Sequence, residues 1–359
     1  MTEKARNKHL KFVERHLQVL PAHHQGHDVN KMAILFYSFQ SLSCLGVDVR
    51  EQYADNIPWI KSHYVTFRDG EIAGFVGSLN MKIGKLVTVN LSNTLFSLLI
   101  LTLFREYRYI HEEMDHQLLG NLVKKCQLPN GSFKSCLDYS GKAVSPVDGE
   151  DLRYCYMAVA ILYLLGCRTT EEFNKYINVE LLETYILDQR CPEGAFGQYG
   201  EAHAGYTSCA LSALSLLGSI QKIPKSYIDK TLLWLSNRQV SSESVMKKQE
   251  DNNPFFDSDD HGGFQGRPNK FADTCYALWC LNSIQLLTPE WELYYDREAV
   301  EKYLIDVTQN NVIGGFSKND ADDPDLYHTC LGISSLTLMR SHLNGALCLP
   351  KEMAEGLLA

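Results

Sequence analysis

The chain has 359 residues, of which 45% are hydrophobic and 11% aromatic, so it can bury a large core. Its formal net charge of −9 and the absence of a basic run argue against a nucleic-acid-binding surface. Its eleven cysteines lack the spacing of a disulfide framework, which predicts reduced thiols and a cytoplasmic location. The N-terminus has no apolar signal region, and the longest strongly apolar run, residues 95–104, is about half of what a membrane span needs. We therefore expect no membrane span.

Amphipathic and apolar helices are expected in the first hundred residues. Residues 9–20 place their apolar side chains on one helical face, whereas residues 29–45 are apolar on nearly all sides. His23, His24 and His27 lie between these segments, and we interpret them as a solvated loop rather than a metal cluster. A further helix is expected from residue 58 to 64, and an apolar helix from 94 to 104.

One pattern recurs along the chain: a helix, a loop with Gly-Phe or Gly-x-Phe, then a more apolar helix. The loop phenylalanines are between 52 and 68 residues apart, at Phe75, Phe133, Phe196, Phe264 and Phe316. The apolar helices after the last four loops are expected at residues 152–166, 206–218, 273–287 and 326–339.

Helix pairs of this size bury little surface alone, so they must stack against one another. An open solenoid would leave one side of the apolar helices in water. We predict instead an all-α, single-domain α–α toroid over residues 1–359, with a central apolar cavity. It would have about six amphipathic helices outside and about six apolar helices inside.

Residues 266–280, GRPNKFADTCYALWC, concentrate chemically active side chains at the start of an apolar helix. Arg267 and Lys270 come just before Asp273, Cys275 and Tyr276. Helix N-termini attract anions and lower the pKa of thiols. We therefore predict a diphosphate site next to a metal site.

His328 is the third predicted metal ligand. Aligning the apolar helices on Cys275 and Cys330 puts Asp273 and His328 at equivalent positions, two residues earlier. An oxygen, a sulfur and a nitrogen ligand suit zinc, and three protein ligands leave the open position of a catalytic site. A helix-capping Asp, a buried Cys and a core His fit the same spacing, so that alternative stays open. The neighbouring cations favour a functional site, because buried cations need an anionic partner.

A substrate thiol at the open zinc position would become a nucleophile at neutral pH, and the nearby cations would stabilise a departing diphosphate. Tyr156, Tyr206 and Trp279 would line an apolar cavity, although such residues more often pack in a core. Together these features indicate transfer of an isoprenoid group onto a cysteine.

The sequence resembles the β subunits of protein prenyltransferases from about residue 8 to 352. The resemblance rests on GRPNKFADTCY, EAHAGYTSC (201–209), DLYHTC (325–330) and the Gly-x-Phe loops, and the likeness is greatest to fungal type I geranylgeranyltransferases. It implies an α–α barrel with one zinc ion held by Asp273, Cys275 and His328. It also implies a heterodimer with a helical-repeat α subunit that contributes a catalytic lysine. The implied diphosphate contacts are His203, Arg267, Lys270 and Tyr276, and the implied isoprenoid contacts are Arg153, Tyr156, Cys209 and Trp279.

Three further positions bear on the lipid and the metals, again by resemblance. Farnesyltransferases have Trp where this chain has Ala33 and Tyr where it has Leu331, so geranylgeranyl diphosphate is the implied lipid donor. They hold magnesium with an Asp at the position of Lys318, whose ammonium would replace the ion, so magnesium is not expected to be required. The implied acceptors are Cys-a-a-X boxes ending mainly in Leu, as in Rho-type small GTPases. Asn90 and Ser92 depart from the animal residues that contact the end of the acceptor.

The alternatives are a farnesyltransferase β subunit, a Rab-type β subunit, a terpene or squalene cyclase, and a non-catalytic toroidal scaffold. Ala33, Lys318 and Leu331 argue against the first, and the long N-terminal extension against the second. A cyclase would use an acidic Asp-x-Asp-Asp motif such as residues 257–260. This tetrad lies in a polar insertion, residues 241–261, and we interpret it as solvated.

Overall fold

The computed structural model describes residues 1–67, 70–141, 150–243, 253–254 and 256–357. Its backbone contacts divide the chain into two compact units, which we describe one at a time. Unit 1 comprises residues 1–19, 189–212 and 220–348, and unit 2 comprises residues 20–188, 213–219 and 349–359. The single-domain organisation and the central apolar cavity stay predictions. No helix in the described ranges is long and apolar enough to cross a membrane.

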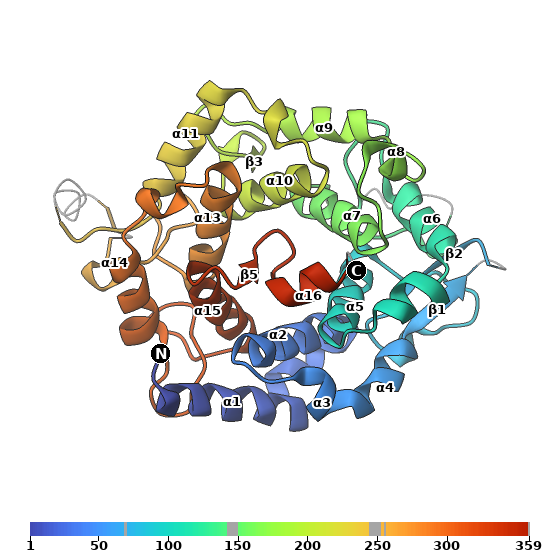
Figure 1. Ribbon diagram of the computed structural model, residues 1–359, viewed down its shortest axis with the longest axis horizontal. Helices are drawn as coiled ribbons and strands as arrows, with labels where there is room; N and C mark the ends of the chain where they lie inside the picture. Colours follow the sequence, from blue (N-terminus) through green and yellow to red (C-terminus); the bar gives the residue numbers. More distant parts are fainter. Residues whose placement is uncertain (68–69, 142–149, 244–252, 255, 358–359) are drawn as a thin grey trace. The chain divides into compact units, whose positions relative to one another are not determined.

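Unit 1 is built from helices joined by short strands and turns (Figure 1). Its α-helices are α1 (Glu3–Gln18), the first part of α10 (Ala204–Leu216), α11 (Lys225–Ser236), α13 (Thr274–Leu287), α14 (Arg297–Lys302) and α15 (Leu326–Met339). Its other elements are β3 (Gly197–Gln198), β4 (Glu201–Ala202), η5 (Ile220–Lys222), η7 (Ser258–Asp260), η8 (Trp291–Tyr294), the π-helical η9 (Tyr303–Thr308) and β5 (Leu343–Asn344). The apolar helix α13 packs against both α11 and α15.

Unit 2 follows the same plan, and its apolar helix α5 packs against α2 and α7. Its α-helices are α2 (Lys31–Cys44), α3 (Val49–Tyr53), α4 (Ile57–Lys61), α5 (Leu91–Leu103), α6 (His116–Cys126), α7 (Leu152–Leu164), α8 (Thr170–Phe173), α9 (Val179–Asp188) and α16 (Lys351–Gly356). Its other elements are η1 (Ala22–Asn30), η2 (Ala54–Asn56), β1 (Tyr64–Phe67), β2 (Ile72–Phe75), η3 (Leu79–Met81), the π-helical η4 (Tyr109–Glu113) and β6 (Leu349–Pro350).

Most of the predicted helices agree with the structure to within a few residues, but α1 begins at Glu3, six residues before the expected start at residue 9. Two other segments differ locally. The helix expected at residues 58–64 ends at Lys61, and the aromatic and β-branched run Tyr64–Phe67 forms β1, which pairs antiparallel with β2. The histidine-rich segment forms the short helix η1 rather than a loop. His27 is exposed there, while the side chains of His23 and His24 lie outside the described residues.

The recurring Gly-x-Phe loops are the points where one helix pair meets the next. Gly131 has φ +90°, and a Cβ there would lie 2.2 Å from the carbonyl oxygen of Leu181 in α9. Gly194, Gly262 and Gly314 also have positive φ and approach the carbonyls of Lys230 in α11, Ala299 in α14 and Lys8 in α1. Only glycine combines this backbone conformation with so close an approach. The phenylalanine two residues later is fully buried at each of these loops, at Phe133, Phe196, Phe264 and Phe316.

A glutamine precedes each of the last four loops, and two of these glutamines bond to the backbone in front of the following helix. The Gln127 side chain accepts a hydrogen bond from the Asn178 N–H at 2.7 Å and donates one to the Asn178 carbonyl at 3.0 Å. Gln239 makes the same pair of bonds with Asp296, at 2.8 and 2.9 Å. These bonds satisfy the backbone just before α9 and α14, so each glutamine joins its loop to the following helix pair.

At the last loop, the partner of the loop glutamine, Gln309, is the side chain of His9 in α1. Its Nδ1 accepts from the Gly315 N–H at 2.9 Å, so its Nε2 carries the proton and donates to Gln309 Oε1 at 3.0 Å. The ring is fully buried and stacks on Phe316, with 4.9 Å between ring centroids. This arrangement requires a neutral imidazole, because a doubly protonated ring cannot accept the bond from Gly315.

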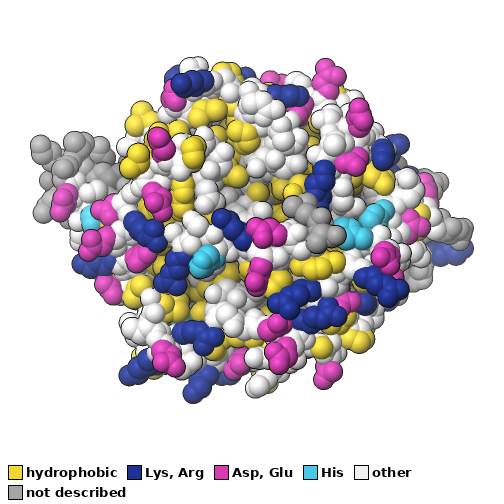
Figure 2. All heavy atoms as spheres, viewed as in Figure 1, with side chains coloured by type: hydrophobic (Ala, Val, Ile, Leu, Met, Phe, Trp, Pro, Cys, Tyr) yellow, Lys and Arg dark blue, Asp and Glu magenta, His cyan; other side chains and the backbone are white. Residues whose placement is uncertain are grey.

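The face of the protein drawn in Figure 2 carries charges of both signs. Figure 2 shows Lys and Arg side chains interspersed with Asp and Glu over the face in view. The described part of that face therefore presents no extended field of one sign, although the whole chain carries a net charge of −9.

We predict that His9 makes the stability of the fold depend on pH. Burial lowers the pKa of His9 below its usual value near 6.5, against the opposing effect of its bond to Gln309. His9 therefore binds a proton more readily in the unfolded chain than in the folded chain. The contribution of His9 to the free energy of unfolding is complete above about pH 6.5 and is lost as the pH drops below that value. Urea unfolding between pH 7.5 and 5 should show this loss.

The variant His9→Phe keeps a ring against Phe316 but leaves the buried Gly315 N–H unpaired. It should be about 1–3 kcal/mol less stable than wild type at pH 7.5 and lose less stability on acidification. His16→Phe, at a partly exposed position of the same helix, is the control. A wild-type pH slope in His9→Phe would contradict the assignment.

Candidate metal centre and anion-binding cluster

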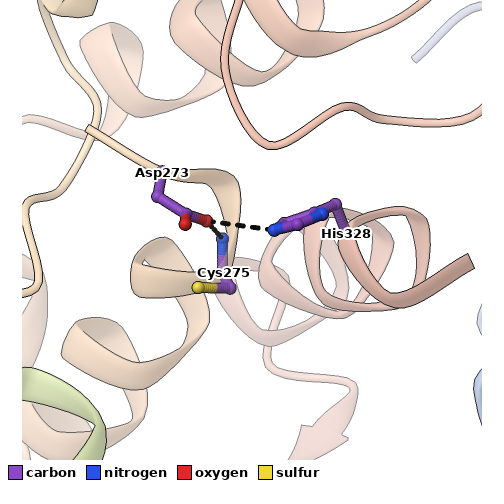
Figure 3. A group of neighbouring side chains, drawn as sticks. All are labelled: Asp273, Cys275 and His328. Atoms are coloured by element: carbon purple, nitrogen blue, oxygen red, sulfur yellow. Dashed lines mark hydrogen bonds and ion pairs between the residues drawn. The ribbon is translucent and has the colours of Figure 1, made fainter. Parts of the chain in front are cut away.

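Three side chains from the first turns of α13 and α15 converge in unit 1 (Figure 3). Asp273 caps α13, and its Oδ1 accepts a hydrogen bond from the Cys275 N–H at 2.8 Å. The Nε2 of His328 lies 3.4 Å from Asp273 Oδ1. One potential ligand atom from each residue lies within 4.8 Å of the other two, and no other group of three such side chains was found among the described residues. The ligand set predicted from the sequence is therefore brought together.

The helix caps correct one step of the sequence argument. Asp273 is the N-cap of α13, but the N-cap of α15 is Asp325, whose Oδ1 accepts from the His328 N–H at 2.9 Å. His328 thus lies three residues beyond its cap, and the equivalence of Asp273 and His328 inferred from the cysteine alignment was wrong. The side chains meet because α13 and α15 pack together, not because they share a repeat position.

Asp325 is a supporting residue that was not singled out from the sequence. Its Oδ2 lies 2.5 Å from His328 Nδ1, which leaves Nε2 facing Asp273. Burial alone would lower the pKa of His328, but the hydrogen bonds to Asp273 and Asp325 outweigh it and raise that pKa to about 9. A carboxylate on the second ring nitrogen is the usual partner of a metal-binding histidine. The signal available in the sequence was an Asp three residues before the His, at a helix start.

The chemistry of the three donors fits zinc. Cys275 is buried, and burial together with the nearby Asp273 raises the pKa of its thiol well above the usual range. A thiolate at this position therefore needs a cation beside it. A sulfur, a nitrogen and an oxygen donor suit zinc, whereas magnesium and calcium prefer oxygen ligands alone.

Two of the predicted anion contacts, His203 and Tyr276, lie beside the three donors. His203 Nδ1 accepts from the N–H groups of Gly205 at 3.0 Å and Tyr206 at 3.4 Å, so it acts as a cap for α10. In a neutral ring this places the proton on Nε2, which lies 3.2 Å from the hydroxyl of Tyr276. A Cβ at Gly266 would lie 2.1 Å from Tyr276 Cζ, so glycine is what allows the phenol to reach this position.

The two predicted cations lie in the loop before α13. The Nη1 of Arg267 forms an ion pair with Oε1 of Glu201 at 2.7 Å, and its side chain is 39% exposed. Glu201, in β4, was not identified from the sequence. Exposed pairs of this kind contribute little to stability, so an incoming anion can replace the carboxylate. Lys270 is partly buried in the same loop.

Lys318 is held close to the start of α13 by its backbone. Its carbonyl accepts from the Thr274 N–H at 2.9 Å, and the Thr274 hydroxyl donates to the Ser317 carbonyl at 2.7 Å. The Lys318 side chain is exposed. Leu331 lies in α15 and is 2% exposed, whereas Cys209 in α10 and Trp279 in α13 are partly exposed.

The remaining predicted contacts belong to unit 2. Arg153 and Tyr156 lie one turn apart in α7, where the exposed Arg153 pairs with the helix cap Asp151 at 2.7 Å. Ala33 is partly exposed in the first turn of α2. Asn90 caps α5 by accepting from the Asn93 N–H at 2.8 Å, and Ser92 is partly exposed in its first turn. The lipid-binding and acceptor-binding roles of these residues stay predictions.

The acidic tetrad of residues 257–260 differs from the prediction at its last member. Its first three positions, residues 257–259, are at least partly exposed, as a solvated segment would be. Asp260 is 5% exposed, so interpreting it as solvated was wrong. Its Oδ2 accepts from the Ala272 N–H at 2.7 Å, which encloses the carboxylate between two segments that are distant in the sequence.

Comparisons with known proteins place this fold and site in a family. A family model described as the prenyltransferase alpha-alpha toroid domain matches residues 5–354. The geranylgeranyl transferase type-1 subunit beta of Arabidopsis thaliana is 28% identical over 365 residues, which covers 96% of this chain and 87% of the relative. The protein farnesyltransferase subunit beta of Pyricularia oryzae is 28% identical over 358 residues, covering 92% of this chain and 62% of the relative.

A solved structure, Candida albicans protein geranylgeranyltransferase-I complexed with GGPP, matches with a TM-score of 0.85 and 28% identity, covering 98% of both chains. These matches confirm the predicted resemblance to protein prenyltransferase β subunits and the predicted all-α toroid fold class. Since the family model spans nearly the whole sequence, the chain belongs to the prenyltransferase alpha-alpha toroid domain family.

Proposed function

We propose that the chain is the catalytic β subunit of a zinc-dependent protein geranylgeranyltransferase. It would transfer the lipid from geranylgeranyl diphosphate to the cysteine of C-terminal Cys-a-a-X boxes, ending mainly in Leu, in small GTPases of the Rho type. The observation that carries the proposal is the convergence of Asp273, Cys275 and His328 beside His203 and Tyr276, in a chain of the prenyltransferase family. The names of the Arabidopsis and Candida relatives support the choice of lipid.

Asp273, Cys275 and His328 would hold the metal ion. When bound, zinc lowers the pKa of a substrate thiol so that a thiolate is available at neutral pH. Neighbouring groups hold two of these ligands in position by hydrogen bonds. Asp325 holds the Nδ1 proton of His328, and the backbone bond from Cys275 to Asp273 restrains the carboxylate.

The neighbouring cluster would bind the diphosphate and stabilise its charge as it leaves. Burial, with Cys275 and Asp273 nearby, raises the pKa of Tyr276, so its phenol stays protonated and can donate a hydrogen bond. The backbone bonds to His203 Nδ1 keep the Nε2 proton on the side facing Tyr276. Arg267 would exchange Glu201 for a phosphate, and Lys270 would add a second positive charge.

The choice of a twenty-carbon lipid rests on particular residues rather than on overall similarity. The Arabidopsis geranylgeranyl transferase subunit and the Pyricularia farnesyltransferase subunit are equally identical to this chain. By the resemblance, farnesyltransferases have Trp where this chain has Ala33 and Tyr where it has Leu331. The small side chain of Ala33 would leave room for a longer lipid. By the resemblance, the proposed isoprenoid contacts are Arg153, Tyr156, Cys209 and Trp279, and each of these side chains is at least partly exposed.

The relatives are named as beta subunits, so we propose a heterodimer with a separate α subunit in the cytoplasm. A farnesyltransferase β subunit is the alternative function, and the Pyricularia relative supports it.

We predict that Cys275→Ala abolishes zinc binding. The wild-type heterodimer should contain about one zinc per β subunit, and the variant almost none, because it lacks the only thiolate of the proposed set. Zinc would be measured by mass spectrometry after extensive dialysis. Cys209→Ala, which removes a partly exposed thiol of the same unit, should keep its zinc. Full zinc retention by Cys275→Ala would refute the ligand set.

A crossed assay tests the reaction and its specificity. The chain is co-expressed with a candidate α subunit and supplied with fifteen- or twenty-carbon diphosphates and peptides ending in Leu, Phe, Met or Ser. We expect the highest kcat/KM for the twenty-carbon donor with the Leu peptide. Faster transfer of the fifteen-carbon group to Met or Ser peptides would favour the farnesyltransferase alternative. Ala33→Trp should shift the preference toward the shorter lipid without changing zinc content, because a large ring would shorten the lipid site.

Lys318 is expected to replace magnesium. Its ammonium would neutralise charge on the diphosphate, so adding magnesium to the zinc-loaded enzyme should change the transfer rate by less than about twofold. Lys318→Ala should lower kcat by about 10–100-fold with unchanged zinc content. A large activation of the wild-type enzyme by magnesium would contradict this role.

A further inference from the structure

The buried carboxylate of Asp260 is bonded to the backbone next to a proposed zinc ligand. Asp260 ends η7, and its Oδ2 accepts from the N–H of Ala272, the residue immediately before Asp273. The bond is 2.7 Å long and joins residues twelve positions apart in the sequence. Among the four positions of the acidic tetrad, only this one is buried. A solvated acidic loop does not explain this contact.

The bond belongs to a frame around residues 272–274. The Asp273 N–H donates to the Phe264 carbonyl at 3.0 Å, and the Gly263 N–H donates to the Asp260 carbonyl at 2.9 Å. Residues 265 and 272 also form a β-bridge. On the other side, Thr274 is bonded to residues 317 and 318. The backbone of Asp273 is thus held on both sides just before α13 begins.

The surroundings of Asp260 make its burial costly. Burial raises the pKa of Asp260 to about 6, against the opposing effect of the hydrogen bond from Ala272. Asp257 and Asp259 from the same turn, and Asp320 from the loop before α15, add to the rise. Tyr303 of η9 is 1% exposed, and its hydroxyl has no hydrogen-bond partner among the residues that the structure describes. The Tyr303 ring and the Ala272 methyl group flank Gly263, where a Cβ would lie 2.7 Å from each. If this position only had to be filled, burying a neutral side chain would cost less free energy than burying a carboxyl group close to other acids.

We propose that Asp260 is a positioning residue for the metal centre. By fixing the N–H of Ala272, its carboxylate sets the direction in which the chain enters α13, and therefore the direction of the Asp273 carboxylate relative to Cys275 and His328. Small shifts of a ligand-bearing backbone weaken metal binding because the ligands must meet at one point. The inference rests on the proposed function, in which Asp273 is a zinc ligand.

The experiment measures zinc affinity of the purified heterodimer by competition with a chelator. Asp260→Ala removes the acceptor and should weaken zinc binding by about 10–100-fold. Asp260→Asn keeps an acceptor oxygen for Ala272 but loses the charge, so it should retain more affinity, about 2–10-fold below wild type. Asp259→Asn, an exposed acid of the same turn, is the matched control and should bind zinc like wild type.

A second readout separates positioning from general loss of stability. Cobalt substituted for zinc absorbs through its bond to the Cys275 thiolate and through its ligand field, so its spectrum reports the geometry of the site. The spectrum should change in Asp260→Ala and return toward wild type in Asp260→Asn. A melting temperature lowered in Asp260→Ala with wild-type zinc affinity and cobalt spectrum would mean a structural role only, and would overturn the inference.

The remaining outcomes distinguish a failure of the proposed function from a failure of the inference about Asp260. If Asp260→Ala does not fold, Asp260→Asn decides, and wild-type zinc affinity in that variant overturns the inference. If wild-type heterodimer binds no zinc, the proposed function fails and the inference falls with it. If wild type binds zinc and Asp260→Ala binds it equally well, the inference alone fails.

Discussion

The packing of α13 against α15 is the interaction on which the site depends, because it brings two helix N-termini together. Each helix start supplies a short carboxylate that satisfies free backbone N–H groups, at Asp273 and Asp325. The same carboxylates also contact His328, one at Nε2 and one at Nδ1. The two carboxylates that cap these helices thus also help to assemble a potential metal centre. If α13 and α15 moved apart, Asp273 and Cys275 would lose His328.

The repeat loops explain how these helix starts are held in place. In the last four loops, a glycine with positive φ lets the loop approach an amphipathic helix, and the phenylalanine two residues later is fully buried. Two of these phenylalanines are also bonded to the apolar helix that follows. The N–H of Phe316, for example, donates to the Thr329 hydroxyl at 2.9 Å in the first part of α15. Phe196 makes the same bond to Thr207 in α10 at 3.0 Å. The loops that repeat most clearly in the sequence therefore position the helices that carry the site.

The sequence predicted what depends on local pattern and residue chemistry. Hydrophobic periodicity located the apolar helices, and an Asp, a Cys and a His suited to zinc were found from their types and their place at helix starts. It did not reveal contacts that depend on how distant segments fold back. Aligning the cysteines placed Asp273 and His328 at equivalent positions, although Asp273 caps α13 and His328 lies three residues beyond the cap of α15. Asp260 looked solvated because its burial requires residues 260 and 272 to meet.

The most direct test of the account is X-ray absorption at the zinc edge of the wild-type heterodimer without substrate. The account predicts one sulfur ligand at about 2.3 Å, from Cys275, and otherwise nitrogen and oxygen ligands at about 2.0–2.2 Å. The sulfur signal should disappear with the metal in Cys275→Ala, which loses one of three ligands. A zinc site without sulfur, or with several sulfur ligands, would contradict the assignment of Asp273, Cys275 and His328 as the metal centre.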